Sequence, residues 1–176
     1  MGSPMSNLSF RGMSLMFKVR DFLRPRGEAL SEAEIQPGLT VLDYGCGPGS
    51  YTLLAAEIVG TGGVVHALDI HPLAVASVQK SASKKRLANV KTVLSDCATG
   101  LDDSSVDVAL MHDVFHDLDD GEAVLRELHR VIRPGGTLSF SDHHMKASEI
   151  VSRVSASGLF ELSRRGKRTY TFSKVG

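Results

Sequence analysis

Short apolar runs alternate with amphipathic stretches along most of the chain, and this alternation predicts strands and helices in turn. Five strands are predicted, at Leu39–Tyr44, Gly63–Asp69, Val90–Ser95, Val106–His112 and Thr137–Asp142. The predicted helices between and after them are Ser50–Val59, Pro72–Arg86, Asp119–Ile132 and Ala147–Ser157. Two further runs, Leu159–Arg164 and Arg168–Lys174, are typical of a β-hairpin. The pattern therefore predicts an α/β domain with a mostly parallel sheet and an antiparallel pair at one side.

The first part of the chain has a different pattern. Met1-Gly2-Ser3-Pro4 is typical of a residual expression tag, and we expect residues 1–9 to lie outside the fold. From Phe10 to Arg26, bulky apolar residues recur every three or four positions among basic ones, which predicts a helix that ends near Pro25. A second short helix is predicted over Gly27–Ile35.

Composition narrows the function classes. The 176 residues include 20 Lys+Arg and 20 Asp+Glu, so the formal charge is zero, and nucleic acid is an unfavourable partner. Two cysteines cannot form a disulfide framework, and no apolar run is long enough for a membrane span or signal peptide. These features predict a single cytoplasmic domain.

The most informative stretch is a glycine-rich turn between the first strand and the next helix. Gly45, Gly47 and Gly49 form G-x-G-x-G, not the G-x-G-x-x-G of dinucleotide sites, and Pro48 removes an amide that a phosphate would use. Asp43 lies two residues before the first glycine, where its carboxylate would repel phosphate and attract an amine. The turn therefore favours a ligand with an ammonium group, and a dinucleotide-dependent oxidoreductase is only a third choice.

Two more acidic residues follow the next strands. Asp69 ends the second strand, where it can accept both hydroxyls of a ribose, and Asp96 follows the third. An amine, a ribose and a base without phosphate describe S-adenosylmethionine. From about Ile35 to Lys174 the chain resembles the class I S-adenosylmethionine-dependent methyltransferases, in particular the ubiquinone and menaquinone C-methyltransferase type. The motifs that carry the resemblance are Val41–Gly49, Ala67–Asp69, Ser95–Cys97, Val106–Met111 and Val131–Gly136.

The resemblance implies a Rossmann-like, doubly wound seven-stranded sheet of order 3-2-1-4-5-7-6 with the seventh strand antiparallel. It implies that Gly45 and Gly47 contact the methionine part of the donor, Asp43 its ammonium group, Asp69 the ribose and Asp96 the adenine amino group. Ile70 and the backbone N–H of Cys97 would flank the adenine. The full set of implied donor-binding positions is Asp43, Tyr44, Gly45, Cys46, Gly47, Asp69, Ile70, Asp96, Cys97 and His112. Cys46 and Cys97 are interpreted as packing residues and not as nucleophiles.

The resemblance also divides the chain, with a helical lid over residues 10–36 and the methyltransferase domain over residues 37–176. The predicted helix at Phe10–Arg26 has three interpretations: a lid over the acceptor, a helix packed on the sheet, or an amphipathic helix at a membrane surface. A cluster of basic residues at the predicted hairpin turn is interpreted as a solvated turn, with an RNA or acidic-partner patch as the alternative. These basic residues are Arg164, Arg165, Lys167 and Arg168.

Four of the seven histidines lie where the fourth and fifth strands end, within His112-Asp113, His116-Asp117 and Asp142-His143-His144. A histidine suits proton removal from a phenol, a quinol or an activated carbon acid, and the candidates in order are His112, His116 and His143. A divalent metal held by Asp142-His143 with His112 or Asp113 is the second interpretation, and simple strand capping is the third.

The sequence thus predicts an S-adenosylmethionine-dependent methyltransferase that acts on a small, hydrophobic or aromatic molecule by in-line transfer, without a resident metal. Two alternatives remain open at this point. One is a non-catalytic module that binds S-adenosylmethionine, and the other is a metal-assisted O-methyltransferase.

Overall fold

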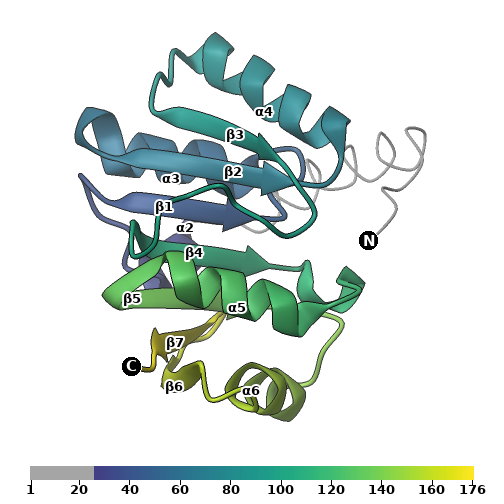
Figure 1. Ribbon diagram of the computed structural model, residues 1–176. Coiled ribbons are helices and arrows are strands. Elements are labelled where there is room, and N and C mark those ends of the chain that lie inside the picture. The colour runs from purple at the N-terminus through teal and green to yellow at the C-terminus, as the bar shows by residue number, and fades with distance from the viewer. Residues whose placement is uncertain (1–25) are drawn as a thin grey trace.

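The computed structural model describes residues 26–176, which form one twisted sheet with helices on both faces (Figure 1). The strands are β1 (Thr40–Tyr44), β2 (Val64–Asp69), β3 (Val90–Leu94), β4 (Val106–His112), β5 (Ile132–Ser141), β6 (Phe160–Arg165) and β7 (Tyr170–Lys174). The helices are α2 (Gly27–Glu32), α3 (Ser50–Val59), α4 (Pro72–Lys85), α5 (Gly121–Val131) and α6 (Ala147–Ser155). Two short 3-10 turns, Gly60–Gly62 and Phe115–Asp117, complete the elements. In this part of the chain, no helix is long and apolar enough to cross a membrane.

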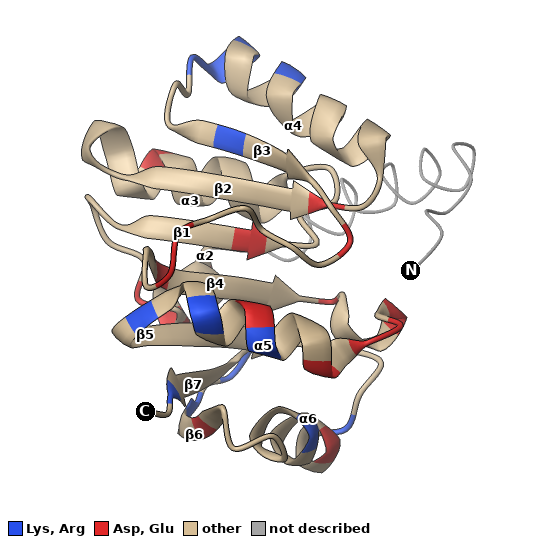
Figure 2. Ribbon diagram, in the orientation of Figure 1, with Lys and Arg blue, Asp and Glu red and all other residues tan. Residues whose placement is uncertain are grey.

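The strand order is β3-β2-β1-β4-β5-β7-β6, which confirms the predicted order. β3, β2, β1, β4 and β5 pair in parallel, whereas β7 runs antiparallel to both β5 and β6. The carboxyl ends of β1, β2, β3 and β4 therefore meet at one edge of the sheet (Figure 1). Acidic residues lie at the ends of β1 and β2 and in the segment after β3 (Figure 2). Ligands of open parallel sheets bind outside this edge.

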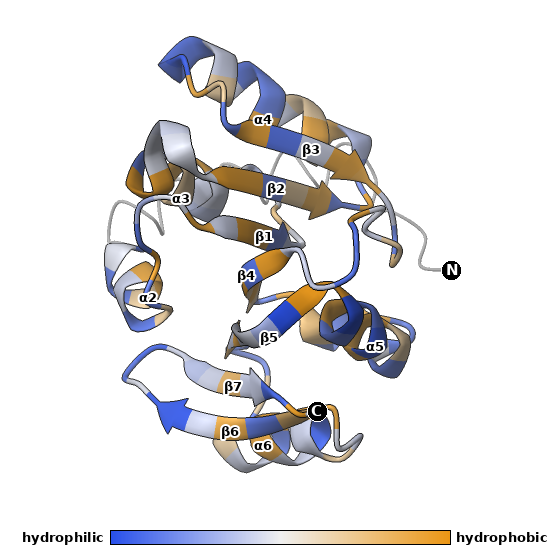
Figure 3. Cartoon of the chain, turned by 60° about the vertical axis from the view of Figure 1, so that its left-hand side comes forward, coloured by the Kyte–Doolittle hydropathy of each residue, from blue (hydrophilic) through white to orange (hydrophobic). Residues whose placement is uncertain are grey.

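Apolar side chains from both faces of the strands form the core. The larger cluster joins β4, β5 and β7 to α5 and α6, and its largest fully buried side chains include Phe140, Phe160 and Phe172. The second cluster joins β1, β2 and β4 to α2 and α3 on the opposite face. β1, β2 and β4 accordingly appear mostly hydrophobic in Figure 3. Burial on both faces explains why these strands are short continuous apolar runs.

The connection from α5 to β5 differs from the predicted one. The sequence pattern places a helix up to Ile132 and a strand from Thr137, but α5 ends at Val131 and β5 begins at Ile132. Ile132 pairs with Val106 and the regular register resumes at Val108 with Thr137, so residues 133–136 form an irregularity inside the strand. Gly135, with φ of +78°, permits this excursion.

α2 lies beside the turn between β6 and β7 (Figure 3) and is joined to it by charged groups. The Glu32 carboxylate accepts hydrogen bonds from the backbone N–H groups of residues 167–169 and from the Thr169 hydroxyl. These bonds lower the pKa of Glu32, although partial burial acts in the opposite direction. Arg168 pairs with Glu28 and Arg164 with Glu34, at 2.9 and 2.8 Å. These two arginines therefore have acidic partners in the same chain, and the RNA or acidic-partner alternative stays a prediction.

The predicted helix at Phe10–Arg26 lies outside the described residues except for Arg26. The tag assignment, the lid and the membrane-surface interpretation therefore stay predictions. Of the predicted second helix, Gly27–Glu32 is helical, and the chain leaves the helix before Glu34, which has φ of +57°.

Candidate active site

The glycine-rich turn after β1 is held against the end of β2 by its own backbone. The N–H groups of Gly45 and Cys46 both donate to the Leu68 carbonyl, at 2.8 and 2.9 Å. Gly45 has φ of +74°, and a Cβ added there would lie 2.5 Å from Cγ2 of Val114. Gly49, with φ of +93°, caps the N-terminus of α3. The glycines thus allow both the left-handed backbone and the close approach of the segment after β4.

Gly45→Ala is expected to lower the free energy of unfolding by about 2 to 4 kcal/mol, because it adds a steric collision to left-handed backbone strain. Gly158→Ala is the matched control, since Gly158 has φ of +69° but nothing lies within 4 Å of its added Cβ. Urea unfolding of both variants measures the difference. Equal losses would show that the collision with Val114 is relieved by a shift of that side chain.

Asp69 joins the turn to the end of β2. Its Oδ2 accepts from the Gly47 N–H and its Oδ1 from the His71 N–H, both at 2.8 Å. Burial raises the pKa of Asp69, while these two bonds act in the opposite direction. Each carboxylate oxygen has a second lone pair, so both can still accept ribose hydroxyls. The carboxylate that was predicted for the ribose therefore also fixes the shape of the glycine-rich turn.

Asp43 is buried at the end of β1, with an exposed fraction of 2%. The Thr52 hydroxyl from the first turn of α3 donates to its Oδ2 at 2.6 Å. Burial nevertheless raises the pKa of Asp43 to about 6. A cation placed beside this carboxylate would favour its charged form. Thr52 was not predicted as a partner, although its place in the first turn after Gly49 puts it next to the strand end.

The segment after β3, where Asp96 and Cys97 were predicted to meet the adenine, is fixed to the sheet. The Tyr44 hydroxyl donates to the Asp96 carbonyl at 2.9 Å, and burial raises the pKa of Tyr44. Tyr44 is therefore buried behind this segment and supports it from the core side. The Cys97 N–H donates to Ser95 Oγ at 3.3 Å, so an adenine would have to compete with this hydroxyl. Ile70, directly after Asp69, is partly exposed at the same edge.

Both thiols behave as packing groups in the described chain. Cys46 is 6% exposed and packs against Ala67 and Val78. Burial raises the pKa of Cys46 and, to a lesser degree, that of Cys97, which packs against the larger core. Neither environment favours a thiolate.

The histidines at the ends of β4 and β5 fall into two groups. His112 is buried under α3, where its Nε2 lies 3.1 Å from Ser139 Oγ and its ring meets the edge of the Tyr51 ring at 4.6 Å. Its Nδ1 has no hydrogen-bond partner among the described residues. Burial lowers the pKa of His112 to about 4, so this imidazole is neutral at physiological pH and a weak base.

The second group lies at the open edge and contains three histidines and two aspartates. Asp142, with no exposed side-chain surface, accepts from the His116 N–H at 3.1 Å and from the His144 N–H at 3.0 Å, and its Oδ2 lies 2.9 Å from His116 Nδ1. Asp113 likewise lies 2.8 Å from His143 Nδ1. The rings of His116 and His144 are 4.1 Å apart, and those of His143 and His144 are 4.0 Å apart. The structure thus brings His116 and His143 together, while His112 is separate and buried.

The same edge has the ligands for a cation. The ligand atoms of Asp113, Asp142 and His143 all lie within 4.8 Å of one another. One imidazole and two carboxylates suit a divalent transition ion. His112, which was the alternative third ligand, is not in this group.

Comparisons with known proteins identify the family of this chain. A family model described as a methyltransferase domain matches residues 35–168. The demethylmenaquinone methyltransferase of Geobacillus sp. (strain WCH70) is 28% identical over 125 residues, which are 70% of this chain and 53% of that protein. The ribosomal protein L11 methyltransferase of Methylococcus capsulatus is 36% identical over 135 residues, 77% of this chain and 43% of that protein. The chain therefore spans about half the length of these curated relatives.

A solved structure extends the likeness over a whole protein. The S-adenosylmethionine-dependent methyltransferase of Aquifex aeolicus superposes with a TM-score of 0.72 at 25% identity, and the match covers 89% of this chain and 95% of that one. Together with the sheet order and the family match, this result shows that the chain belongs to the class I S-adenosylmethionine-dependent methyltransferases.

Proposed function

We propose that this protein transfers the methyl group of S-adenosylmethionine to an oxygen or an acidic carbon of a small aromatic molecule, such as a quinol. The single observation that carries the acceptor class is the His116–Asp142 pair at the edge where the methyl group would point. A relative named for demethylmenaquinone supports the same class.

The donor half of the proposal uses the sheet edge from β1 to β3. Asp69 would accept the ribose hydroxyls, Asp43 would pair with the ammonium group, and Asp96 would accept from the adenine amino group. Gly45 and Gly47 would let the methionine part approach the backbone. These residues hold the sulfonium in place but need no chemistry of their own, because most of the catalysis of an in-line displacement comes from positioning.

The acceptor half needs a base when the nucleophile arrives protonated. Asp142 holds Nδ1 of His116, so a proton on that nitrogen leaves Nε2 with the lone pair once the exposed Asp117 carboxylate, 3.4 Å from Nε2, turns toward solvent. In the proposed step, Nε2 takes the proton of the acceptor, the new bond forms to the methyl carbon, and the electron pair of the breaking C–S bond stays on sulfur. The products are the methylated acceptor and S-adenosylhomocysteine. His143 with Asp113 is the second pair that can act in this way.

Release of S-adenosylhomocysteine from S-adenosylmethionine over a panel of quinols, catechols, thiols and amines tests this function. Turnover with quinols or catechols supports it. Micromolar donor binding by calorimetry with no turnover on any class would contradict it and favour a non-catalytic donor-binding module.

A second candidate function follows from the cluster of Asp113, Asp142 and His143, whose ligand atoms are close enough to share a cation. A divalent ion there would hold two neighbouring oxygens of a catechol-type acceptor, as in a metal-assisted O-methyltransferase. Repeating the panel with a chelator separates the two candidates. Turnover that is lost with the chelator and restored by zinc, iron or nickel supports the metal, whereas turnover that resists the chelator supports the histidine base.

The assignment of Asp43 to the ammonium group predicts a pH-dependent donor affinity. Burial raises the pKa of Asp43 to about 6, so the folded protein favours the protonated carboxyl. The folded state is therefore most stable, with respect to this group, below about pH 4, and it loses that stability as the pH rises through 6. The ammonium group favours the carboxylate, so donor binding is coupled to proton release below pH 6. We expect S-adenosylhomocysteine to bind more tightly at pH 7.5 than at pH 5 by calorimetry, and Asp43→Asn to remove that difference. An unchanged pH dependence in Asp43→Asn would contradict the assignment.

A further inference from the structure

The segment between β3 and β4, residues 95–105, carries the proposed adenine wall but has no helix or strand of its own. It is instead held by side chains of the strand β1 and of the helix α5. Tyr44 in β1 holds the Asp96 carbonyl, as described above. The rest of the segment is held by α5, through side chains that belong to none of the sequence motifs.

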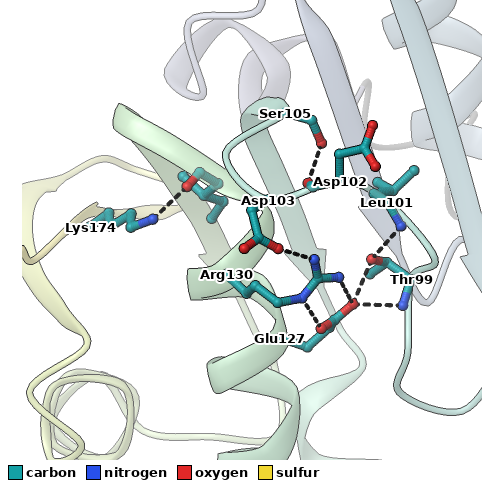
Figure 4. Close-up of polar contacts among 9 residues, drawn as sticks. Thr99, Leu101, Asp102, Asp103, Ser105, Glu127, Arg130 and Lys174 are labelled. Atoms are coloured by element: carbon teal, nitrogen blue, oxygen red, sulfur yellow. Dashed lines mark hydrogen bonds and ion pairs between the residues drawn. The ribbon is translucent and has the colours of Figure 1, made fainter.

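Glu127 in the second half of α5 makes the central contacts (Figure 4). Its Oε1 accepts from both the backbone N–H and the hydroxyl of Thr99, at 2.8 and 2.6 Å. Thr99 is 1% exposed, and its hydroxyl oxygen in turn accepts from the Leu101 N–H at 3.2 Å. One carboxylate oxygen therefore fixes the conformation of three successive residues, two to four positions beyond Cys97.

Arg130, one helical turn later, completes the arrangement. Its guanidinium donates to both oxygens of Glu127, at 2.9 and 2.8 Å, and to Asp103 at 2.5 Å (Figure 4). These bonds, mainly the one from Arg130, hold the pKa of Glu127 at about 2 in spite of partial burial. Glu127 is therefore ionised, and its carboxylate accepts hydrogen bonds from both Thr99 and Arg130. The segment is held at both ends of its turn, by Glu127 at Thr99 and by Arg130 at Asp103.

We propose that Glu127 is a positioning residue for the donor: by holding Thr99, it sets the place of Asp96 and Cys97 and so determines how well the protein recognises the adenine amino group. The inference rests on the proposed donor site, because it assumes that Asp96 faces the adenine. Glu127 itself lies in α5, behind the wall that this segment forms, and acts only through the segment.

The geometry favours an effect on recognition over a purely general effect on stability. Tyr44 fixes only the carbonyl of Asp96. The position of the residues after Asp96 therefore depends on the contact between Thr99 and Glu127. When Glu127 is removed, the Thr99 N–H and hydroxyl lose their acceptor, and burying them unpaired is costly. The segment is then expected to move toward solvent, and the carboxylate of Asp96 with it, while β1, β2 and the glycine-rich turn stay in place.

Calorimetry with two ligands tests the inference. The first is S-adenosylhomocysteine, and the second is S-inosylhomocysteine, in which a carbonyl oxygen replaces the adenine amino group and would face Asp96. The native protein is expected to prefer the first strongly. In Glu127→Ala, we expect the affinity for S-adenosylhomocysteine to fall about tenfold and that for S-inosylhomocysteine to change less than threefold, so that the preference shrinks. For the same variant, KM for the donor should rise with kcat nearly unchanged.

Two sets of variants control the experiment. Glu122→Ala removes an exposed ion pair to Arg126 on the same helix and should leave both affinities unchanged. Thr99→Ser keeps the hydroxyl and should bind both ligands as the native protein does. Thr99→Val removes the hydroxyl and should show the same change in the two affinities as Glu127→Ala. Equal losses for the two ligands, or no loss for either, would overturn the positioning role.

Asp69→Ala, measured in parallel, separates this inference from the proposed donor site. If Asp69→Ala loses donor affinity and Glu127→Ala does not, only the role of Glu127 fails. If neither variant loses affinity, the donor site itself is wrongly placed.

Discussion

Asp69→Ala is expected to weaken S-adenosylhomocysteine binding by about 1 to 3 kcal/mol, roughly 5- to 150-fold, because hydrogen bonds to a charged group are lost. The structure gives a second reason for a value near the upper end. The same carboxylate accepts from the N–H groups of Gly47 and His71, so its removal also loosens the turn that would contact the methionine part. Calorimetry with purified protein measures the change.

Glu161→Ala is the control for this substitution, because Glu161 is exposed on β6, far from the carboxyl edge of β1 and β2. Thermal unfolding of both variants separates lost binding from lost folding. Native donor affinity in a folded Asp69→Ala protein would refute the ribose assignment and the proposed donor site with it.

His116→Ala is expected to lower kcat by about 10²- to 10⁴-fold while donor affinity stays within about twofold of the native value. The reason is that His116 is held by Asp142 at the acceptor end of the edge, whereas the proposed donor contacts come from β1, β2 and the segment after β3. S-adenosylhomocysteine release with the best acceptor of the panel gives kcat, and calorimetry gives the donor affinity.

His129→Ala is the matched control, since this histidine lies on α5 and contacts the Val175 carbonyl, far from the edge. Asp142→Asn should act in the same direction as His116→Ala, with an added cost in stability because Asp142 also accepts two backbone N–H groups. If His116→Ala retained native kcat while His143→Ala lost it, the base would be the histidine that Asp113 holds.

The strands β1, β2 and β4 could be predicted from the sequence because they are buried on both faces. Each of them is therefore a continuous apolar run whose ends give the bounds of the strand. Val106–His112 matches its predicted bounds for this reason. The helix α3 also matches its predicted bounds, Ser50–Val59, because a glycine flanks it at each end. The start of β5 was missed because Ile132 is strand-like only through its pairing with Val106, across an irregularity that no local pattern shows.

The histidines show a similar limit within the site. His112 is the first candidate from the sequence, yet His112 and His116 are four positions apart and each precedes an aspartate, so no local pattern separates them. His112 is the last residue of β4 and is covered by Tyr51, whereas His116 lies in the 3-10 turn that follows and reaches Asp142. Burial and partner, which depend on α3 and β5, decide which imidazole can act as a base. The roles of Thr52 and Glu127 likewise depend on contacts between distant segments.

The contact between α2 and the turn of β6 and β7 has a consequence for the order in which the chain folds during synthesis. Glu32 finds its backbone partners 135 to 137 residues later in the chain. β1 to β4, which carry the proposed donor edge, are synthesised before β7 can pair with β5 and shield its open edge. Until then Glu32 lacks these partners, and Phe160 and Phe172 are missing from the core. The hairpin of β6 and β7 therefore both completes the sheet and supplies the backbone partners of α2.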